Sequence, residues 1–179
     1  MSTLLASWLG MQAVHEAGHV LAARATGGVV ERVVLHPLTI SRTDLAENPR
    51  PLLVVWAGPL FGVAAPLLAW GIAWFLRWEG AFLLRFFAGF CLVANGLYIA
   101  LGSFGRIGDA GDMIRHGAPA WWLWLFGLVT VPAGLWLWHG QGRHFGFGTA
   151  HGRVNRTAAY IMLAACVILL ALGLGIGGR

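Results

Sequence analysis

The chain has 179 residues, of which 58% are hydrophobic and only 11% are charged. A soluble domain carries about 25% charged residues, so this composition excludes an ordinary soluble domain and indicates a protein that crosses the membrane several times. The formal net charge of +5 comes from arginines spread singly along the chain. Nucleic-acid binding typically needs runs of basic residues, and we therefore expect no nucleic-acid partner.

Five apolar stretches are long enough to cross a lipid bilayer, which takes about 20 residues. They cover about residues 4–25, 52–76, 81–101, 119–138 and 157–176. Tryptophans cluster at both ends of the fourth stretch, as an aromatic belt would place them. The expected fold is an all-α membrane protein with about five transmembrane helices, forming a single domain over residues 1–179.

The first apolar stretch contains His15-Glu16-Ala17-Gly18-His19. Two histidines four residues apart lie one above the other on a helix face, as two ligands of one metal ion must. Glu16 projects beside them, where a carboxylate can hydrogen-bond a metal-bound water. The alternative is a helix with two polar core histidines and a stray carboxylate, but ionisable side chains in lipid are costly without a function. The spacing therefore predicts a metal site at membrane depth.

A short β-hairpin is expected between the first two helices. Gly27 and Gly28 end the first helix, and β-branched residues dominate positions 29–35. Pro37 interrupts this run, and residues 38–43 resume in an extended pattern. Such a pattern favours paired strands at the membrane surface.

Candidates for a third metal ligand follow the third apolar stretch, in Gly108-Asp109-Ala110-Gly111-Asp112. After one crossing out and one back, this segment returns to the face where the first helix ends. Three glycines between residues 102 and 108 would let the helix unwind and bring a carboxylate inward. Spacing alone leaves both Asp109 and Asp112 open, and an aspartate-capped turn is the alternative.

Other potential ligands are expected to have no metal role. The loop over residues 140–156 holds His144 and His151 at irregular spacing, which favours a solvated loop. Cys91 and Cys166 lie within apolar runs and are expected to be small core residues.

Taken together, these motifs make the sequence resemble the site-2 protease family of intramembrane zinc metalloproteases. The resemblance rests on three pieces in order: His15-Glu16-Ala17-Gly18-His19, Ala57-Gly58-Pro59-Leu60 and Gly108-Asp109-Ala110-Gly111. The third piece is typically Leu-Asp-Gly-Gly in the family, and its Asp is the third zinc ligand. The resemblance covers about residues 10–115, leaves the last two apolar stretches outside, and includes no recognisable regulatory domain.

The resemblance implies a Zn²⁺ ion held by His15, His19 and Asp109, with Glu16 as the general base. Asp112 would then either hydrogen-bond a ligand histidine or replace Asp109 as the ligand.

Two further elements have candidate roles in this interpretation. Family members often carry an Asn shortly before the Asp, and it is thought to help polarise the substrate. Asn95 stands 14 residues before Asp109 and is either an oxyanion donor or a helix-packing residue. The segment over residues 29–43 either pairs with an unwound substrate through its edge or is simply a surface hairpin.

The expected function is hydrolysis of peptide bonds in membrane-spanning or membrane-associated protein substrates. One alternative is a non-proteolytic membrane scaffold that keeps the metal for structure. A small metal-ion transporter ranks third, because the other helices supply almost no polar residues for a transit path.

The distribution of arginines bears on orientation. Seven fall on the side of the metal site and five on the opposite side, which favours a cytoplasmic active-site face. We expect a multi-pass protein in the plasma membrane of a prokaryotic cell.

Overall fold

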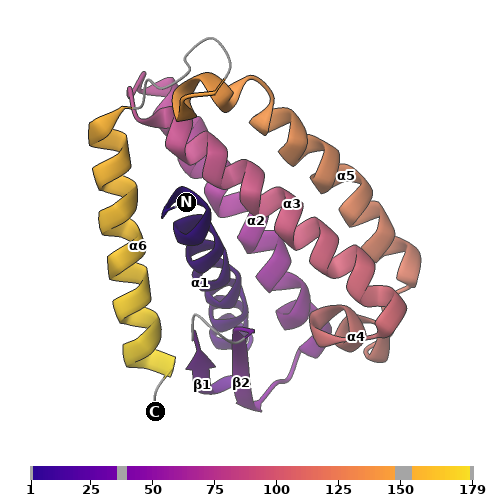
Figure 1. The fold of residues 1–179 in the computed structure, drawn as a ribbon. Helices are drawn as coiled ribbons and strands as arrows, with labels where there is room; N and C mark the ends of the chain where they lie inside the picture. The colour runs from indigo at the N-terminus through magenta and orange to yellow at the C-terminus, as the bar shows by residue number, and fades with distance from the viewer. Residues whose placement is uncertain (1, 36–39, 148–154, 178–179) are drawn as a thin grey trace.

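The computed structural model describes residues 2–35, 40–147 and 155–177. Within them, long helices run roughly side by side, with α2 and α3 in the middle, α5 against α3, and α6 on the far side of α1 (Figure 1). The long helices are α1 (Ser2–Ala25), α2 (Pro51–Phe75), α3 (Ala81–Gly105), α5 (Ala120–Trp138) and α6 (Arg156–Gly177). The short elements are strands β1 (Val29–Val34) and β2 (Arg42–Glu47), helix α4 (Gly108–Arg115) and the 3₁₀ helix η1 (Gln141–Phe145).

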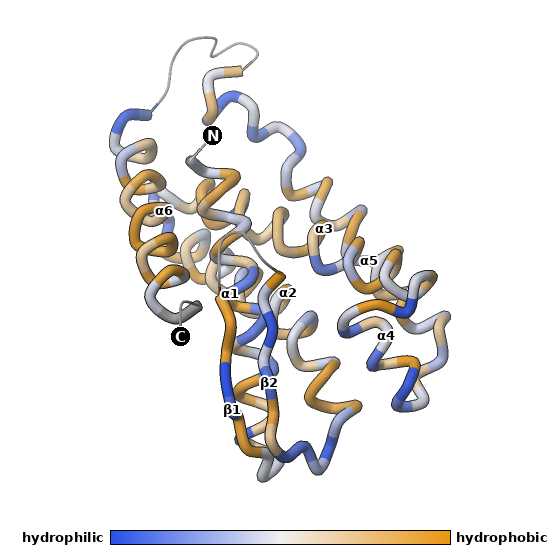
Figure 2. Tube along the Cα trace, turned by 60° about the horizontal axis from the view of Figure 1, so that its bottom comes forward, coloured by the Kyte–Doolittle hydropathy of each residue, from blue (hydrophilic) through white to orange (hydrophobic). Residues whose placement is uncertain are grey.

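Of the helices in the described residues, α2, α3, α5 and α6 are long and apolar enough to cross a membrane. Hydrophilic residues gather at the hairpin and α4 and in the connections at the other end, with apolar helices between them (Figure 2). The sequence predicted five spans, and the count of five is not confirmed. α1 has the length, but Gln12, His15 and Glu16 interrupt its apolar character.

Close contact between α3 and α5 fixes the position of α3. A side chain at Gly134 would lie 2.7 Å from the Gly89 carbonyl, and one at Gly127 would lie 2.9 Å from the Gly96 carbonyl. Small residues at such crossings allow helix backbones to approach closely, which is how helices associate in lipid. This packing holds in place the helix that carries Asn95.

The end of α3 differs from expectation. The helix does not unwind at its glycines but continues to Gly105, and then Arg106 takes a left-handed conformation with φ of 52°. Gly108 also has a positive φ, 54°, a conformation that glycine adopts readily. The chain therefore makes a sharp turn and starts a new helix, α4, instead of a loop.

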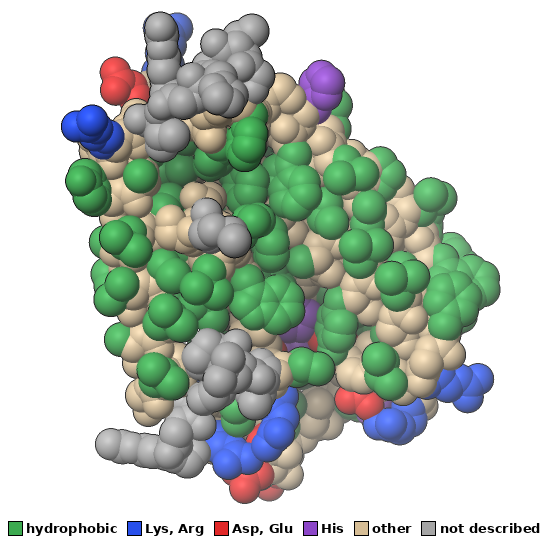
Figure 3. Space-filling view, viewed as in Figure 1, with side chains coloured by type: hydrophobic (Ala, Val, Ile, Leu, Met, Phe, Trp, Pro, Cys, Tyr) green, Lys and Arg blue, Asp and Glu red, His purple; other side chains and the backbone are tan. Residues whose placement is uncertain are grey.

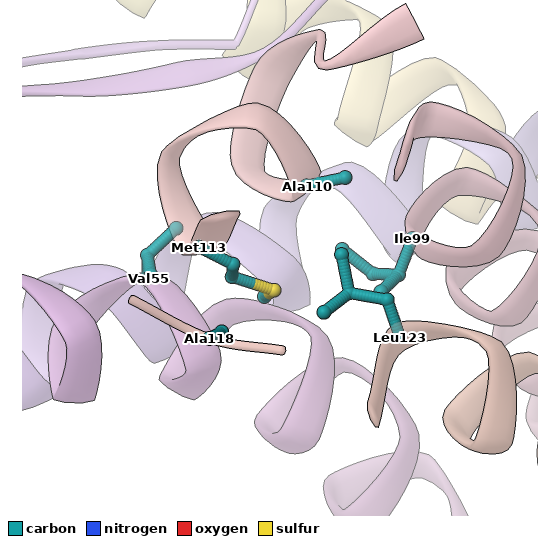
Figure 4. Close-up of a cluster of buried hydrophobic side chains, with 6 residues drawn as sticks. All are labelled: Val55, Ile99, Ala110, Met113, Ala118 and Leu123. Carbon is teal, nitrogen blue, oxygen red and sulfur yellow. The ribbon is translucent and has the colours of Figure 1, made fainter. Parts of the chain in front are cut away.

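A buried apolar cluster seats α4 on the bundle. It consists of Val55, Ile99, Ala110, Met113, Ala118 and Leu123 (Figure 4). Ala110 and Met113, three residues apart and on one side of α4, are both fully buried. Asp109 lies outside this cluster, in the first turn of α4, where a carboxylate interacts favourably with the helix N-terminus.

The predicted hairpin is present, but its second strand begins later than expected. β1 and β2 are antiparallel, with Val33 opposite Thr43 and Val34 opposite Arg42. Asp44 forms ion pairs with Arg32 across the strands at 3.2 Å and with Arg42 at 3.0 Å. The Arg32–Asp44 pair joins the two strands and so supports their pairing. Part of the expected second strand, residues 38–39, lies outside the described residues.

Candidate metal centre

Three side chains from α1 and α4 converge at the C-terminal half of α1. The Nε2 atoms of His15 and His19 are 3.1 Å apart. Asp109 Oδ2 lies 2.7 Å from His15 Nε2 and 3.3 Å from His19 Nε2. Both histidines are buried. Within the part of the chain that the structure describes, this trio is the group of His, Cys, Asp or Glu side chains placed to hold a metal ion.

The other ring nitrogens define the protonation of both histidines. His15 Nδ1 donates to Asn95 Oδ1 at 2.7 Å, and His19 Nδ1 donates to the Val54 carbonyl at 2.9 Å. Because both partners are oxygen acceptors, each neutral ring carries its hydrogen on Nδ1 and leaves Nε2 as a bare lone pair. Metal-binding histidines are typically held in this way.

This arrangement tests whether a metal ion fits. Two Nε2 lone pairs and a carboxylate oxygen face one another, and acceptors repel unless a cation or a proton lies between them. Zn²⁺ favours nitrogen and oxygen ligands, and its catalytic sites use three protein ligands with one position left open. The donor set of His15, His19 and Asp109 therefore suits zinc.

Asp109 is held by its backbone as well as by its carboxylate. Its N–H donates to the Tyr98 hydroxyl at 3.2 Å. Burial would raise the pKa of its carboxyl, but the close approach of the His15 and His19 rings lowers that pKa below its ordinary value. Asp109 is thus an anion, as a metal ligand must be.

Gly58 of α2 completes the wall behind the histidines. A Cβ atom at this position would overlap His19 Nε2 and lie 2.9 Å from His15 Nε2. Only glycine leaves room for the rings at this point, which gives a physical reason for the Ala57-Gly58-Pro59 piece of the sequence pattern.

Glu16 lies next to the trio and is only 3% exposed. Its Oε2 accepts a hydrogen bond of 2.7 Å from Thr43 Oγ1 on β2. Glu16 and the trio line one cavity of about 580 Å³, whose other walls come from α1, the hairpin, α2, α3 and α4. A histidine and part of an acidic side chain are visible between hydrophobic side chains near the middle of one face (Figure 3).

The remaining candidates do not join the trio. Asp112 also lines the cavity, but it pairs with Arg115 and its side chain is 46% exposed. His144 of η1 stacks on Phe82, and burial, followed by the nearby Arg143 and Arg85, lowers its pKa. His151 lies outside the described residues.

Asn95 contacts a ligand histidine instead of standing free in the cavity. Its Nδ2 donates to the Cys91 carbonyl at 2.8 Å, which leaves Oδ1 as the acceptor for His15. Helix packing and oxyanion donation were the roles suggested by the sequence. Orientation of His15 is the role that these contacts support.

Sequence reasoning did not predict several contacts of the site. The bond from His19 to the Val54 carbonyl uses a backbone atom, which no residue type reveals, and Thr43 reaches Glu16 only because the hairpin folds over α1. Tyr98 could have been found, because it follows Asn95 by three residues and so lies on nearly the same face of α3.

Apolar membrane-spanning helices, an H-E-x-x-H helix and a distant aspartate that meets it define a membrane protein of the metalloprotease class. The chain belongs to the family described as Peptidase M50B-like, which it matches over residues 6–107; this is the site-2 protease family. The match covers α1, the hairpin, α2 and α3, and ends two residues before Asp109. Comparisons with curated proteins and with solved structures return no match.

Proposed function

We propose that this protein is an intramembrane zinc endopeptidase that hydrolyses peptide bonds of membrane-spanning or membrane-associated proteins. One observation carries the proposal. The ligand atoms of His15, His19 and Asp109 lie within 4.8 Å of one another, and the buried carboxylate of Glu16 lines the same cavity. A site with structural metal alone needs the ligands but has no use for a buried carboxylate beside them.

Zinc, when bound, would polarise a carbonyl and lower the pKa of water from about 15.7 to about 7. Glu16 is the group that takes a proton from the attacking water as its oxygen bonds to the carbonyl carbon. The same carboxyl then delivers that proton to the amine nitrogen as the carbon–nitrogen bond breaks. Asn95 and the Val54 carbonyl hold the histidine rings throughout, so little reorganisation accompanies the reaction.

The substrate must be extended at the scissile bond, because a helical peptide bond is shielded by its own hydrogen bonds. Residues 40–45, which include most of β2, line the cavity. β2 pairs with β1 and, in the described residues, with no other strand. We therefore propose that the free edge of β2 adds the unwound substrate as a further strand.

α1 is proposed as a fifth crossing of the bilayer. At 24 residues and about 1.5 Å per residue it is long enough, and α2, α3 and α6 all contact it. These neighbours keep its polar residues from lipid, which makes their cost tolerable. The arginine distribution supports a cytoplasmic active-site face in the plasma membrane of a prokaryote.

Glu16→Gln tests the proposal. The full chain is co-expressed in a bacterium with single-span reporter proteins whose transmembrane segments contain helix-breaking Gly, Ser or Pro. The variant should keep zinc and fold but lose cleavage by about 100-fold or more, the usual contribution of a general base. Glu79→Gln, in the exposed connection between α2 and α3, is the matched control and should cleave normally.

Two results would argue against a protease. Cleavage by Glu16→Gln at the wild-type rate would remove the general base from the mechanism. Absence of cleavage by the wild type, together with full complementation of a deletion strain by Glu16→Gln, would favour the scaffold alternative.

A further inference from the structure

The hairpin contributes a side chain to the general base itself. Thr43 lies in the second position of β2, and its Oγ1 donates to Glu16 Oε2 at 2.7 Å. Among the described residues, no other side chain donates a hydrogen bond to the Glu16 carboxylate. We infer that Thr43 is a positioning residue that aims Glu16 into the cavity, an inference that rests on the proposed function.

The chemistry of the contact suits a base that must stay active. A carboxylate has two oxygens, and Thr43 occupies only Oε2, so Oε1 is left to accept a proton. The threonine hydroxyl is a neutral donor, so it orients Glu16 without forming an ion pair with it. A buried carboxylate with no donor would carry a large desolvation cost, and its side chain would turn toward any available polar group.

The hairpin register determines which residue reaches Glu16. Thr43 stands opposite Val33, and Asp44 joins β2 to β1 through its ion pair with Arg32. A one-residue slip of a strand turns every side chain to the other face. The slipped strand would present Arg42 or Asp44 at this position, and neither is a neutral donor. The orientation of Glu16 therefore depends on the correct register of the hairpin.

An opposite role is also testable, since a contact with the base can restrain it. If the Thr43 hydrogen bond held Glu16 in an inactive orientation, its loss would raise the rate. A positioning role requires that its loss lower the rate. The two roles thus predict opposite changes in the cleavage rate when the Thr43 hydroxyl is removed.

The experiment uses the full-length protein in detergent with a reporter that the wild type cleaves. Thr43→Val removes the hydroxyl and keeps the shape. It should lower kcat by up to about 100-fold, the loss typical of a misplaced catalytic group, with KM and zinc content unchanged. Thr43→Ser restores the donor and should recover most of kcat. The matched control is Thr130→Val on α5, whose hydroxyl bonds its own helix at the Phe126 carbonyl, and it should behave as wild type.

A double-mutant cycle on thermal unfolding, with Thr43→Val and Glu16→Ala singly and together, tests the contact apart from catalysis. The two changes should be non-additive, as expected for a directly interacting pair. Additive effects, an unchanged or raised kcat in Thr43→Val, or loss of zinc from that variant would each overturn the inference. Failure of the wild type to cleave any reporter would instead count against the proposed function.

Discussion

Asn95 follows His15 by 80 residues in the chain, yet its side-chain oxygen accepts a 2.7 Å hydrogen bond from His15 Nδ1. The Asn95 amide is itself oriented by its bond to the Cys91 carbonyl. α3 therefore sets the tautomer of a histidine on α1, and with it the direction in which the His15 Nε2 lone pair points.

Replacing Asn95 by Ala should weaken zinc binding about 10- to 100-fold, the usual effect of removing a group that orients a metal-binding histidine. Competition with a chromogenic chelator would measure the affinity. Asn95→Asp keeps an oxygen acceptor and should retain more of the affinity than Asn95→Ala. Equal zinc affinities in Asn95→Ala and the wild type would show that His15 needs no such partner.

Gly58→Ala should abolish zinc binding, because the added Cβ would occupy the space of His19 Nε2 and crowd His15 Nε2. Overpacking of this kind costs about 1–3 kcal/mol, and the ligands cannot move away without losing their geometry. Gly71→Ala is the matched control on α2, since a side chain there meets nothing within 4 Å. Metal analysis of both purified variants checks the prediction, and full zinc content in Gly58→Ala would contradict it.

Replacement of the two aspartates of α4 should have different effects on zinc content. Asp109→Ala removes an atom that lies 2.7 Å from His15 Nε2, so bound zinc should be lost. Asp112 pairs with Arg115 and is only half-buried, so Asp112→Ala should keep zinc. The reverse pattern of metal content would place the ligand three residues further along the chain.

Tyr98→Phe isolates the hydroxyl that receives the Asp109 N–H. The variant leaves this N–H without its acceptor, which costs about 1–3 kcal/mol when the group is buried. We expect zinc affinity to fall about 10-fold while the helix packing survives. Tyr160→Phe, on the exposed surface of α6, controls for loss of a phenol and should bind zinc as the wild type does.

Much of the fold follows from local properties of the chain. Apolar runs of about 20 residues must satisfy their backbone groups internally in lipid, which makes them helices. This is why the five long helices begin and end within a few residues of the predicted stretches, apart from the C-terminal end of α3. The pairing of His15 with His19 is equally local, because the period of one helix brings them to the same face.

The bounds of the hairpin and the helical state of α4 depend on tertiary contacts, which the local sequence pattern does not predict. β2 runs through Asp44 because its carboxylate pairs with arginines on both strands, whereas β-propensity alone placed the strand earlier. α4 is a helix because Ala110 and Met113 bury themselves against α2, α3 and α5, which outweighs the tendency of three nearby glycines to form a loop.

The sequence by itself thus determined a membrane helix bundle with an H-E-x-x-H pair, because helix period and hydropathy are properties of neighbouring residues. Only the tertiary structure decided that Asp109 and not Asp112 meets the histidines, that Asn95 orients His15, and that Thr43 reaches Glu16. Each of these contacts joins residues at least 27 positions apart. Their partners are selected by how α3, α4 and the hairpin pack around α1, and that packing is settled by the whole chain at once.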